Sequence, residues 1–254
     1  MSTKVFIVSH KNLKLPRLNG YYPLQVGLSK HDFIGYLRDN TGENIAEKNP
    51  NYCELTAMYW IWKNVHSDIK GLVHYRRFFS NSPFLFTLKQ KHSHIIGIND
   101  INLYLSNYDM ILPRKRHYYI ETNWSHYVHA HNSEGIKETK RVIAKYYPNY
   151  LKPFKISMNS RSAHMFNMMI AKLSVFDAYS KWLFSVLYKV EHNLDISNWD
   201  TYESRVYGFI SELLLDVWLR KHSNITYKEL PVAFMGNQHW IKKSSNFIMR
   251  KVCH

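Results

Sequence analysis

Residues 71–77 read Gly71-Leu72-Val73-His74-Tyr75-Arg76-Arg77. The first five form a short apolar run of the kind that fills a buried strand, and two arginines follow it directly. Comparable runs occur at residues 4–9 (KVFIVS), 108–112, 163–171 and 225–227. Because short, fully buried strands are typical of parallel sheets, these runs predict the strands of an α/β protein.

Apolar residues at helical spacing predict helices between these strands. They cover residues 52–65, 174–191 and 206–217, and a capping-box spacing from Asn51 to Glu54 marks the start of the first. The roughly 40 residues after the first strand carry turn signals at Leu18-Asn19-Gly20 and Asn40-Thr41-Gly42, so an irregular segment is expected there. Strands alternating with helices favour a mostly parallel sheet flanked by helices, and no linker or repeat divides residues 1–254, which predicts one domain.

Basic clusters stand where the predicted strands end. They are Ser9-His10-Lys11, His74-Tyr75-Arg76-Arg77 and Pro113-Arg114-Lys115-Arg116. In open α/β sheets ligands bind at the carboxyl ends of the strands. Guanidinium groups hold diphosphate oxygens and offset the charge that grows on a leaving group, so the arginines predict a nucleoside diphosphate site. The alternative is that they face solvent or pair with carboxylates, and that His74 is a packed core histidine.

The segment from Arg38 to Tyr52 is rich in groups that hydrogen-bond a base, a ribose or a sugar hydroxyl. It is a candidate wall of the nucleotide or sugar pocket. The alternative is an Asx-rich turn that caps the following helix, with Asn51 as the capping residue.

A stripe of functional side chains runs along the predicted helix at 206–217. Arg205, Gly208, Glu212 and Asp216 are three or four residues apart and therefore share one face. A carboxylate on this face can take the proton from an acceptor hydroxyl that attacks an anomeric carbon. The alternative is a solvated helix face.

Metal and other cofactor motifs are missing from the sequence. His126, His129 and His131 lack the i, i+4 spacing of a zinc site, and no Asp-x-Asp occurs to hold a divalent ion on a sugar nucleotide. Dinucleotide, P-loop and hydrolase motifs are also missing. We therefore predict no metal ligands and no certain cofactor, with a manganese or magnesium ion as the remaining option.

The composition is that of a basic globular protein. The 254 residues carry 34 Lys plus Arg against 19 Asp plus Glu, a formal charge of +15, which favours polyanionic partners. Cys53 and Cys253 suggest no disulfide framework, and residues 1–10 hold too short an apolar run for a signal peptide. These features predict a cytoplasmic protein, or one peripheral to the inner face of the membrane.

Three long strings resemble DUF4422, a bacterial family found in capsule, O-antigen and exopolysaccharide clusters and regarded as GT-A-like glycosyltransferases. The strings are Val8-Ser9-His10-Lys11, the segment from Asn49 to Asn64 that begins NPNYCELTA, and Gly71 to Phe79. Further matches are Tyr127 with His131, Asn167-Met168, Trp182 to Phe184, and Arg205 with Gly208 to Glu212. The resemblance spans nearly the whole chain.

The resemblance implies a GT-A-like, Rossmann-like fold and a hexosyltransferase. Its donor would be a UDP-sugar, with UDP-galactose and UDP-galactofuranose as options, and its acceptor a growing glycan or a lipid-linked glycan. The His74 to Arg77 segment looks like the positional counterpart of the Asp-x-Asp of GT-A enzymes, so the arginines become candidates to replace a metal. Asp39 to Glu43 and Glu134-Gly135 depart from the family pattern, which leaves the donor open.

Two catalytic and twelve donor-binding candidates follow from the strand ends and the resemblance. The catalytic candidates are Glu212 and His131. The donor-binding candidates are His10, Lys11, Asp39, Asn44, Asn49, Tyr52, His74, Tyr75, Arg76, Arg77, Asn167 and Arg205.

Two other functions fit the sequence. The charge of +15 and the aromatic content of 15% also suit a nucleic-acid-binding protein, although the basic residues are scattered rather than aligned on one helix. A catalytically inactive glycan-binding relative is the third possibility.

Overall fold

The computed structural model describes residues 1–28, 31–82 and 88–235. Cys253 and the basic pairs near the carboxyl end lie outside these ranges. The strands are β1 (Thr3–Ser9), β2 (Tyr21–Gln25), β3 (Leu37–Arg38), β4 (Ile69–His74), β5 (Arg77–Phe79), β6 (Met110–Pro113), β7 (Arg116–His117), β8 (Ser162–Ala163), β9 (Met169–Lys172), β10 (Tyr227–Leu230) and β11 (Val232–Phe234). The helices are α1 (Asn49–Tyr52), α2 (Leu55–Asn64), α3 (Leu88–Ser93), α4 (Ile98–Asn107), α5 (Asn123–Ala130), α6 (Ser133–Tyr146), α7 (Leu151–Asn159), α8 (Leu173–Asn193) and α9 (Val206–Lys221).

One mixed sheet organises the molecule, in the order β10-β6-β9-β4-β1-β2-β3. β1 pairs in parallel with both β2 and β4, while β9 runs antiparallel to β4 and β6. The other strands of this path point the same way, so the predicted mostly parallel α/β sheet is confirmed. Because the chain leaves β1 for β2 on one side and returns to β4 on the other, the topological switch point lies between β1 and β4.

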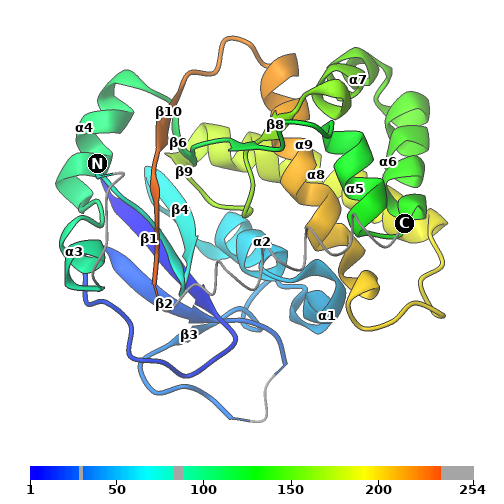
Figure 1. Ribbon diagram of the computed structural model, residues 1–254. Helices are drawn as coiled ribbons and strands as arrows, with labels where there is room; N and C mark the ends of the chain where they lie inside the picture. Colours follow the sequence, from blue (N-terminus) through cyan, green and yellow to red (C-terminus); the bar gives the residue numbers. More distant parts are fainter. Residues whose placement is uncertain (29–30, 83–87, 236–254) are drawn as a thin grey trace.

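Helices cover both faces of this sheet (Figure 1). Along β1, Phe6 and Val8 belong to the hydrophobic cluster beneath α2, α8 and α9, whereas Val5 and Ile7 belong to the cluster shared with α4. This division follows from the alternation of side chains along a strand. It explains why residues 5–8 are apolar at every position.

The predicted first helix is wrong in detail. Cys53, with a φ of 52°, separates α1 from α2, and Asn51 lies inside α1 rather than capping a helix. Its side-chain nitrogen donates to the Ser204 carbonyl at 2.9 Å. Gly208 allows α9 to approach this break, since a Cβ there would lie 3.1 Å from the Cys53 sulfur.

Other boundaries also differ from expectation. The segment predicted to be irregular contains β2 and β3, and the expected strand at 163–171 is divided into β8 and β9 by a turn. Phe166 and Asn167 in that turn have φ values of 82° and 48°, which end any strand. The last predicted strand begins only at Tyr227, because the Thr226 backbone is bound by Asp109.

Candidate functional site

A pocket opens at the switch point of the sheet, where β1 and β4 end. We call it the strand-end pocket; its volume is about 440 Å³. It is lined by Val8, Ser9, His10, Val26, Asn49, Pro50, Cys53, Glu54, His74, Tyr75, Arg76, Arg77 and Arg205. The sheet topology therefore brings together the basic clusters of two predicted strand ends.

Positive charge dominates the strand-end pocket. Burial lowers the pKa of His10, and the charges of Lys11, Arg76 and Arg205 lower it further. The Arg76 guanidinium lies 5.0 Å from the centre of the Tyr75 ring, and that of Arg77 lies 4.5 Å from the Phe166 ring. Cations held on aromatic faces around one cavity suit an anion with several oxygens.

His74 supports this pocket from within the sheet. It is buried, and its Nε2 lies 2.6 Å from the Phe166 carbonyl oxygen. Burial lowers the pKa of His74, so the neutral ring donates its Nε2 proton to that carbonyl. The end of β4 is thereby joined to the turn between β8 and β9.

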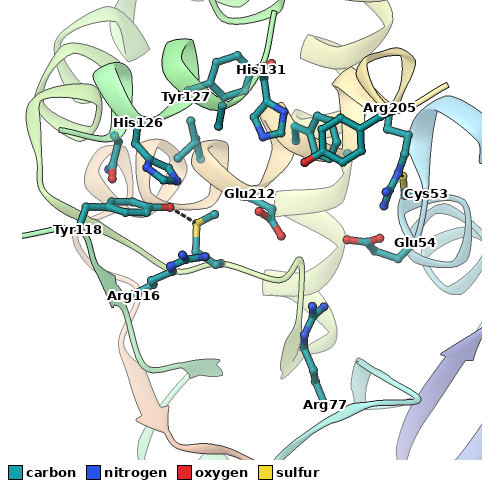
Figure 2. A pocket seen from close by; sticks show the side chains of 17 residues that line it. Cys53, Glu54, Arg77, Arg116, Tyr118, His126, Tyr127, His131, Arg205 and Glu212 are labelled. Atoms are coloured by element: carbon teal, nitrogen blue, oxygen red, sulfur yellow. Dashed lines mark hydrogen bonds between the residues drawn. The ribbon is translucent and has the colours of Figure 1, made fainter. Parts of the chain in front are cut away.

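A second pocket lies beside the first, against α5 and α9 (Figure 2). We call it the helix-side pocket; its volume is about 310 Å³. It is lined by Cys53, Glu54, Arg77, Arg116, Tyr118, Asn123, His126, Tyr127, Ala130, His131, Met165, Tyr202, Arg205, Gly208, Phe209, Glu212 and Leu213. The two pockets share Cys53, Glu54, Arg77 and Arg205, so a ligand in one adjoins a ligand in the other.

Glu212 is a carboxylate with an unusual environment. Burial and the negative charge of Glu54 raise the pKa of Glu212 to about 7, while Arg77 and Arg116 oppose the rise. Its Oε1 accepts the Phe166 backbone N–H at 3.0 Å. In Figure 2, Glu212, Glu54 and Arg77 point toward the same space. A carboxylate with a pKa near neutrality is suited to accept a proton from a substrate hydroxyl.

The turn at Phe166 and Asn167 holds the two carboxylates in place. Asn167 Nδ2 donates to Glu54 Oε1 at 2.8 Å and to the Gly208 carbonyl at 3.1 Å, and Ser211 donates to Asn167 Oδ1 at 2.9 Å. Left-handed backbone at non-glycine residues is strained and collects at functional sites. Cys53, Phe166 and Asn167 are three such residues around one site.

His131 and Cys53 are neutral at pH 7. Burial, with the charges of His126 and Arg205, lowers the pKa of His131 to about 4, and its ring stacks on Phe209 at 4.0 Å. Burial and the charge of Glu54 raise the pKa of Cys53 to about 11, which disfavours a thiolate nucleophile.

The structure does not bring every predicted donor residue to a pocket. Asp39 is fully buried and accepts the Gly27 N–H at 2.9 Å, and burial raises its pKa. Asn44 accepts the Ala46 N–H at 3.2 Å, as in the Asx-turn alternative, and the buried Tyr52 donates to Glu191 at 3.0 Å. These contacts give the three residues structural roles, and Lys11 lies outside the lining with an exposed side chain.

The remaining predicted residues surround the two pockets. His10, Asn49, His74, Tyr75, Arg76, Arg77 and Arg205 line the strand-end pocket, whereas Glu212 and His131 line the helix-side pocket. Asn167 lines neither pocket, but its side chain bonds Glu54, which lines both. From the predicted stripe on α9, Asp216 is absent from the lining because it binds His164 at 2.8 Å.

Sequence reasoning did not assign a site role to several lining residues. Glu54 was visible only as a candidate cap, and Arg116 only as part of a basic strand end. Tyr118 and Asn123 gave no signal, because neither the loop residue that follows β7 nor the first residue of α5 belongs to a distinctive pattern. His126 belonged to the rejected zinc pattern, and it contacts Glu121 at 2.8 Å.

No three or more His, Cys, Asp or Glu side chains come close enough to hold a metal ion within residues 1–28, 31–82 and 88–235. In the same ranges no helix is long and apolar enough to cross a bilayer. Independence from metal stays a prediction.

The chain belongs to the family called Domain of unknown function (DUF4422), whose model matches residues 4–223. No curated protein matches the chain. Among solved structures it is similar to the apo structure of WbbM, a bifunctional glycosyltransferase, with 29% sequence identity and a TM-score of 0.83 over 93% of this chain. This chain covers 46% of the WbbM chain and therefore corresponds to about half of that protein.

Proposed function

We propose that this protein is a glycosyltransferase that moves a sugar from a nucleotide-sugar donor to a hydroxyl of an acceptor. The observation that carries the proposal is the junction of the two pockets, where cationic groups in one adjoin a carboxylate with a pKa of about 7 in the other. The similarity to WbbM supports it.

The donor diphosphate would occupy the strand-end pocket and the acceptor the helix-side pocket. The acceptor oxygen forms a bond to the anomeric carbon as its proton passes to Glu212. The bond from that carbon to the diphosphate breaks, and its electron pair leaves with the diphosphate. Arg76 and Arg77 offset the charge that grows on the leaving group, so that no metal is required.

A UDP-sugar, with galactose or galactofuranose as the sugar, is the donor we propose on the resemblance to the family. The acceptor in this proposal is a bacterial surface glycan, and the basic surface would favour contact with the anionic inner face of the membrane.

The proposal is tested by incubating the protein with a panel of nucleotide sugars and measuring release of the nucleoside diphosphate. We expect release from at least one donor, and little release by Glu212→Gln. If no donor of the panel is consumed, with or without glycan acceptors, a catalytically inactive glycan-binding protein becomes the better account.

A further inference from the structure

One stripe of α5 forms a wall of the helix-side pocket. Asn123, His126, Tyr127 and Ala130 are spaced i, i+3, i+4 and i+7, and all four line the cavity. A capping box fixes the start of the helix, because Thr122 Oγ1 accepts the Ser125 N–H at 3.1 Å and Ser125 Oγ accepts the Thr122 N–H at 2.9 Å. The wall is therefore a preorganised surface.

This wall offers hydrogen-bond acceptors that the described part of the chain does not use. Asn123 Nδ2 donates to the carbonyls of Ser157 and Ser162 at 2.8 and 3.0 Å, which fixes the orientation of the amide. Its Oδ1 is buried and has no hydrogen-bond partner among the described residues. A buried polar atom of this kind calls for a ligand or a water.

His126 is oriented in a similar way. Its Nδ1 lies 2.8 Å from Glu121 Oε2, and the ring points into the pocket in Figure 2. In the neutral form of His126, the contact with Glu121 keeps the ring proton on Nδ1 and leaves Nε2 as an acceptor. A third unused polar atom is His131 Nδ1. It lies 3.8 Å from Glu203 Oε1, which is too far for a hydrogen bond, and it has no other partner in the described ranges.

Aromatic rings stand beside these acceptors. Tyr118 stacks on His126 with ring centres 3.9 Å apart, the Arg116 guanidinium lies 5.4 Å from the centre of the Tyr118 ring, and Phe209 stacks on His131 at 4.0 Å. The α5 stripe itself holds no Asp, Glu, Lys or Arg, whereas Arg77, Arg116 and Arg205 line other parts of the helix-side pocket. Hydroxyl donors at the rim of a sugar ring match a wall whose acceptors are held in place by aromatic rings.

We propose that the α5 wall binds the acceptor as a neutral sugar ring, with Asn123 Oδ1 and His126 Nε2 accepting hydrogen bonds from its hydroxyls and Tyr118 holding the His126 ring in place. This inference rests on the proposed function and names a sugar ring as the group on the α5 wall; a phosphate drawn by the arginines of the pocket is the competing ligand that the test distinguishes.

The test is saturation-transfer NMR with methyl glycosides of the common hexoses and N-acetylhexosamines, in the presence of UDP. We expect a signal from at least one glycoside with the wild-type protein. Ala130→Leu keeps a good helix former but fills the pocket, so the signal should fall at least ~10-fold. Ala178→Leu, at an exposed position on α8, is the matched control and should keep it.

A second pair of variants separates binding from folding. Tyr118→Ala should lose the signal, and Tyr118→Phe should retain it because the ring that stacks on His126 remains. UDP should raise the melting temperature of each variant as it does for the wild type. Inorganic phosphate should not compete with the glycoside.

Absence of glycoside signals with the wild type, or signals unchanged by Ala130→Leu, would overturn the proposed acceptor site. A glycoside signal displaced by inorganic phosphate would also overturn it, in favour of a phosphate ligand. If glycosides bind as expected but UDP leaves the melting temperature unchanged, the sugar site stands and the transferase proposal fails.

Discussion

Glu212 is the residue on which the proposed chemistry depends most. It lies between the charge of Glu54 and the N–H of Phe166, so its side chain can alternate between protonated and ionised forms near neutral pH. We predict that Glu212→Gln lowers the rate of transfer by about 10²–10⁴-fold, the usual contribution of a general base. The measurement is steady-state turnover with the best donor of the panel.

The control for this variant is donor binding. Glutamine keeps the shape and can still accept the Phe166 N–H, so the affinity for UDP should stay within about twofold of the wild-type value. Full activity in Glu212→Gln would remove this residue from the base role and leave Glu54 as the carboxylate to examine.

The pH dependence of the reaction follows from the same pKa. A general base acts in its ionised form, and the pKa of Glu212 is raised to about 7. The rate should therefore rise with pH between about 6 and 8, with a midpoint near 7. A profile that is flat across this interval, measured with saturating donor, would contradict the assignment.

At the scale of elements, the close contact of β4 with β9 depends on a glycine. A Cβ on Gly71 would lie 2.6 Å from the Ile170 side chain and 3.0 Å from its Cα. We predict that Gly71→Ala destabilises the protein by about 1–3 kcal/mol, because the two strands must move apart. Urea unfolding measures the change.

Gly97→Ala is the matched control, since the nearest atom to its Cβ is 3.9 Å away and its φ is −88°. It should change stability by less than about 1 kcal/mol. Equal stability of Gly71→Ala and the wild type would show that the β4–β9 contact is less tight than described.

A buried ion cluster joins the turn between β8 and β9 to its surroundings. The two ring nitrogens of His164 bond the carboxylates of Asp216, at 2.8 Å, and Glu229, at 2.9 Å. The Asp216 carboxylate also accepts the backbone N–H of His164 at 2.8 Å. Burial favours the neutral form of His164, but the bonds to Asp216 and Glu229 prevail and raise its pKa. We predict that His164→Leu destabilises the protein by about 1–3 kcal/mol, because the buried Asp216 loses its imidazole partner and keeps only the backbone N–H of residue 164 and Lys115, at 3.8 Å.

The sign of the pH effect can be stated. Since the pKa of His164 is raised in the folded state, its contribution is complete below its ordinary pKa of about 6.5 and falls as pH rises through the folded value. The difference in urea midpoint between wild type and His164→Leu should therefore be largest near pH 6 and smaller at pH 9. A difference that grows with pH would refute the charged pairing.

The sequence predicted those elements whose pattern is local. The runs at β1, β4 and β6 and the long apolar face of α8 were recognisable, since each depends on the periodicity of its own residues. β2 was missed because Pro23 stands within it, and proline argues against a strand. The turn at Phe166 and Asn167 was missed because it contains no glycine, and glycine is the usual sequence signal of a positive φ.

The candidate site was predictable to the same extent. The basic strand ends and Glu212 could be found from spacing and resemblance. The roles of Glu54, Tyr118 and Asn123 depend on contacts between segments distant in sequence, such as the bond from Asn167 to Glu54. Such contacts have no local signature.

At the scale of the whole molecule, the sheet fixes where the two substrates would meet. The switch point between β1 and β4 places the strand-end pocket at the carboxyl ends of these central strands. The helices α5 and α9 form the helix-side pocket beside it. The family match and the similarity to WbbM, a bifunctional glycosyltransferase of which this chain covers 46%, concern the fold that carries these pockets.

The rival function also belongs to this scale. A nucleic-acid-binding protein with a charge of +15 would bind oligonucleotides with an affinity that falls steeply with salt. We predict only weak oligonucleotide binding at 200 mM salt, measured by fluorescence anisotropy. Tight oligonucleotide binding at this salt concentration, combined with no change in melting temperature on addition of sugar nucleotides, would favour the nucleic-acid-binding function.

The most direct test of the central claim is the melting temperature of the protein with UDP. At a concentration of UDP ~100-fold above its dissociation constant, binding should add about 2.7 kcal/mol of stability, and EDTA should not remove the effect. Arg77→Ala should weaken UDP binding by about 1.5–3 kcal/mol, while Arg114→Ala, which alters an exposed arginine outside both pockets, should leave it unchanged. A melting temperature that no nucleoside diphosphate raises would contradict the account.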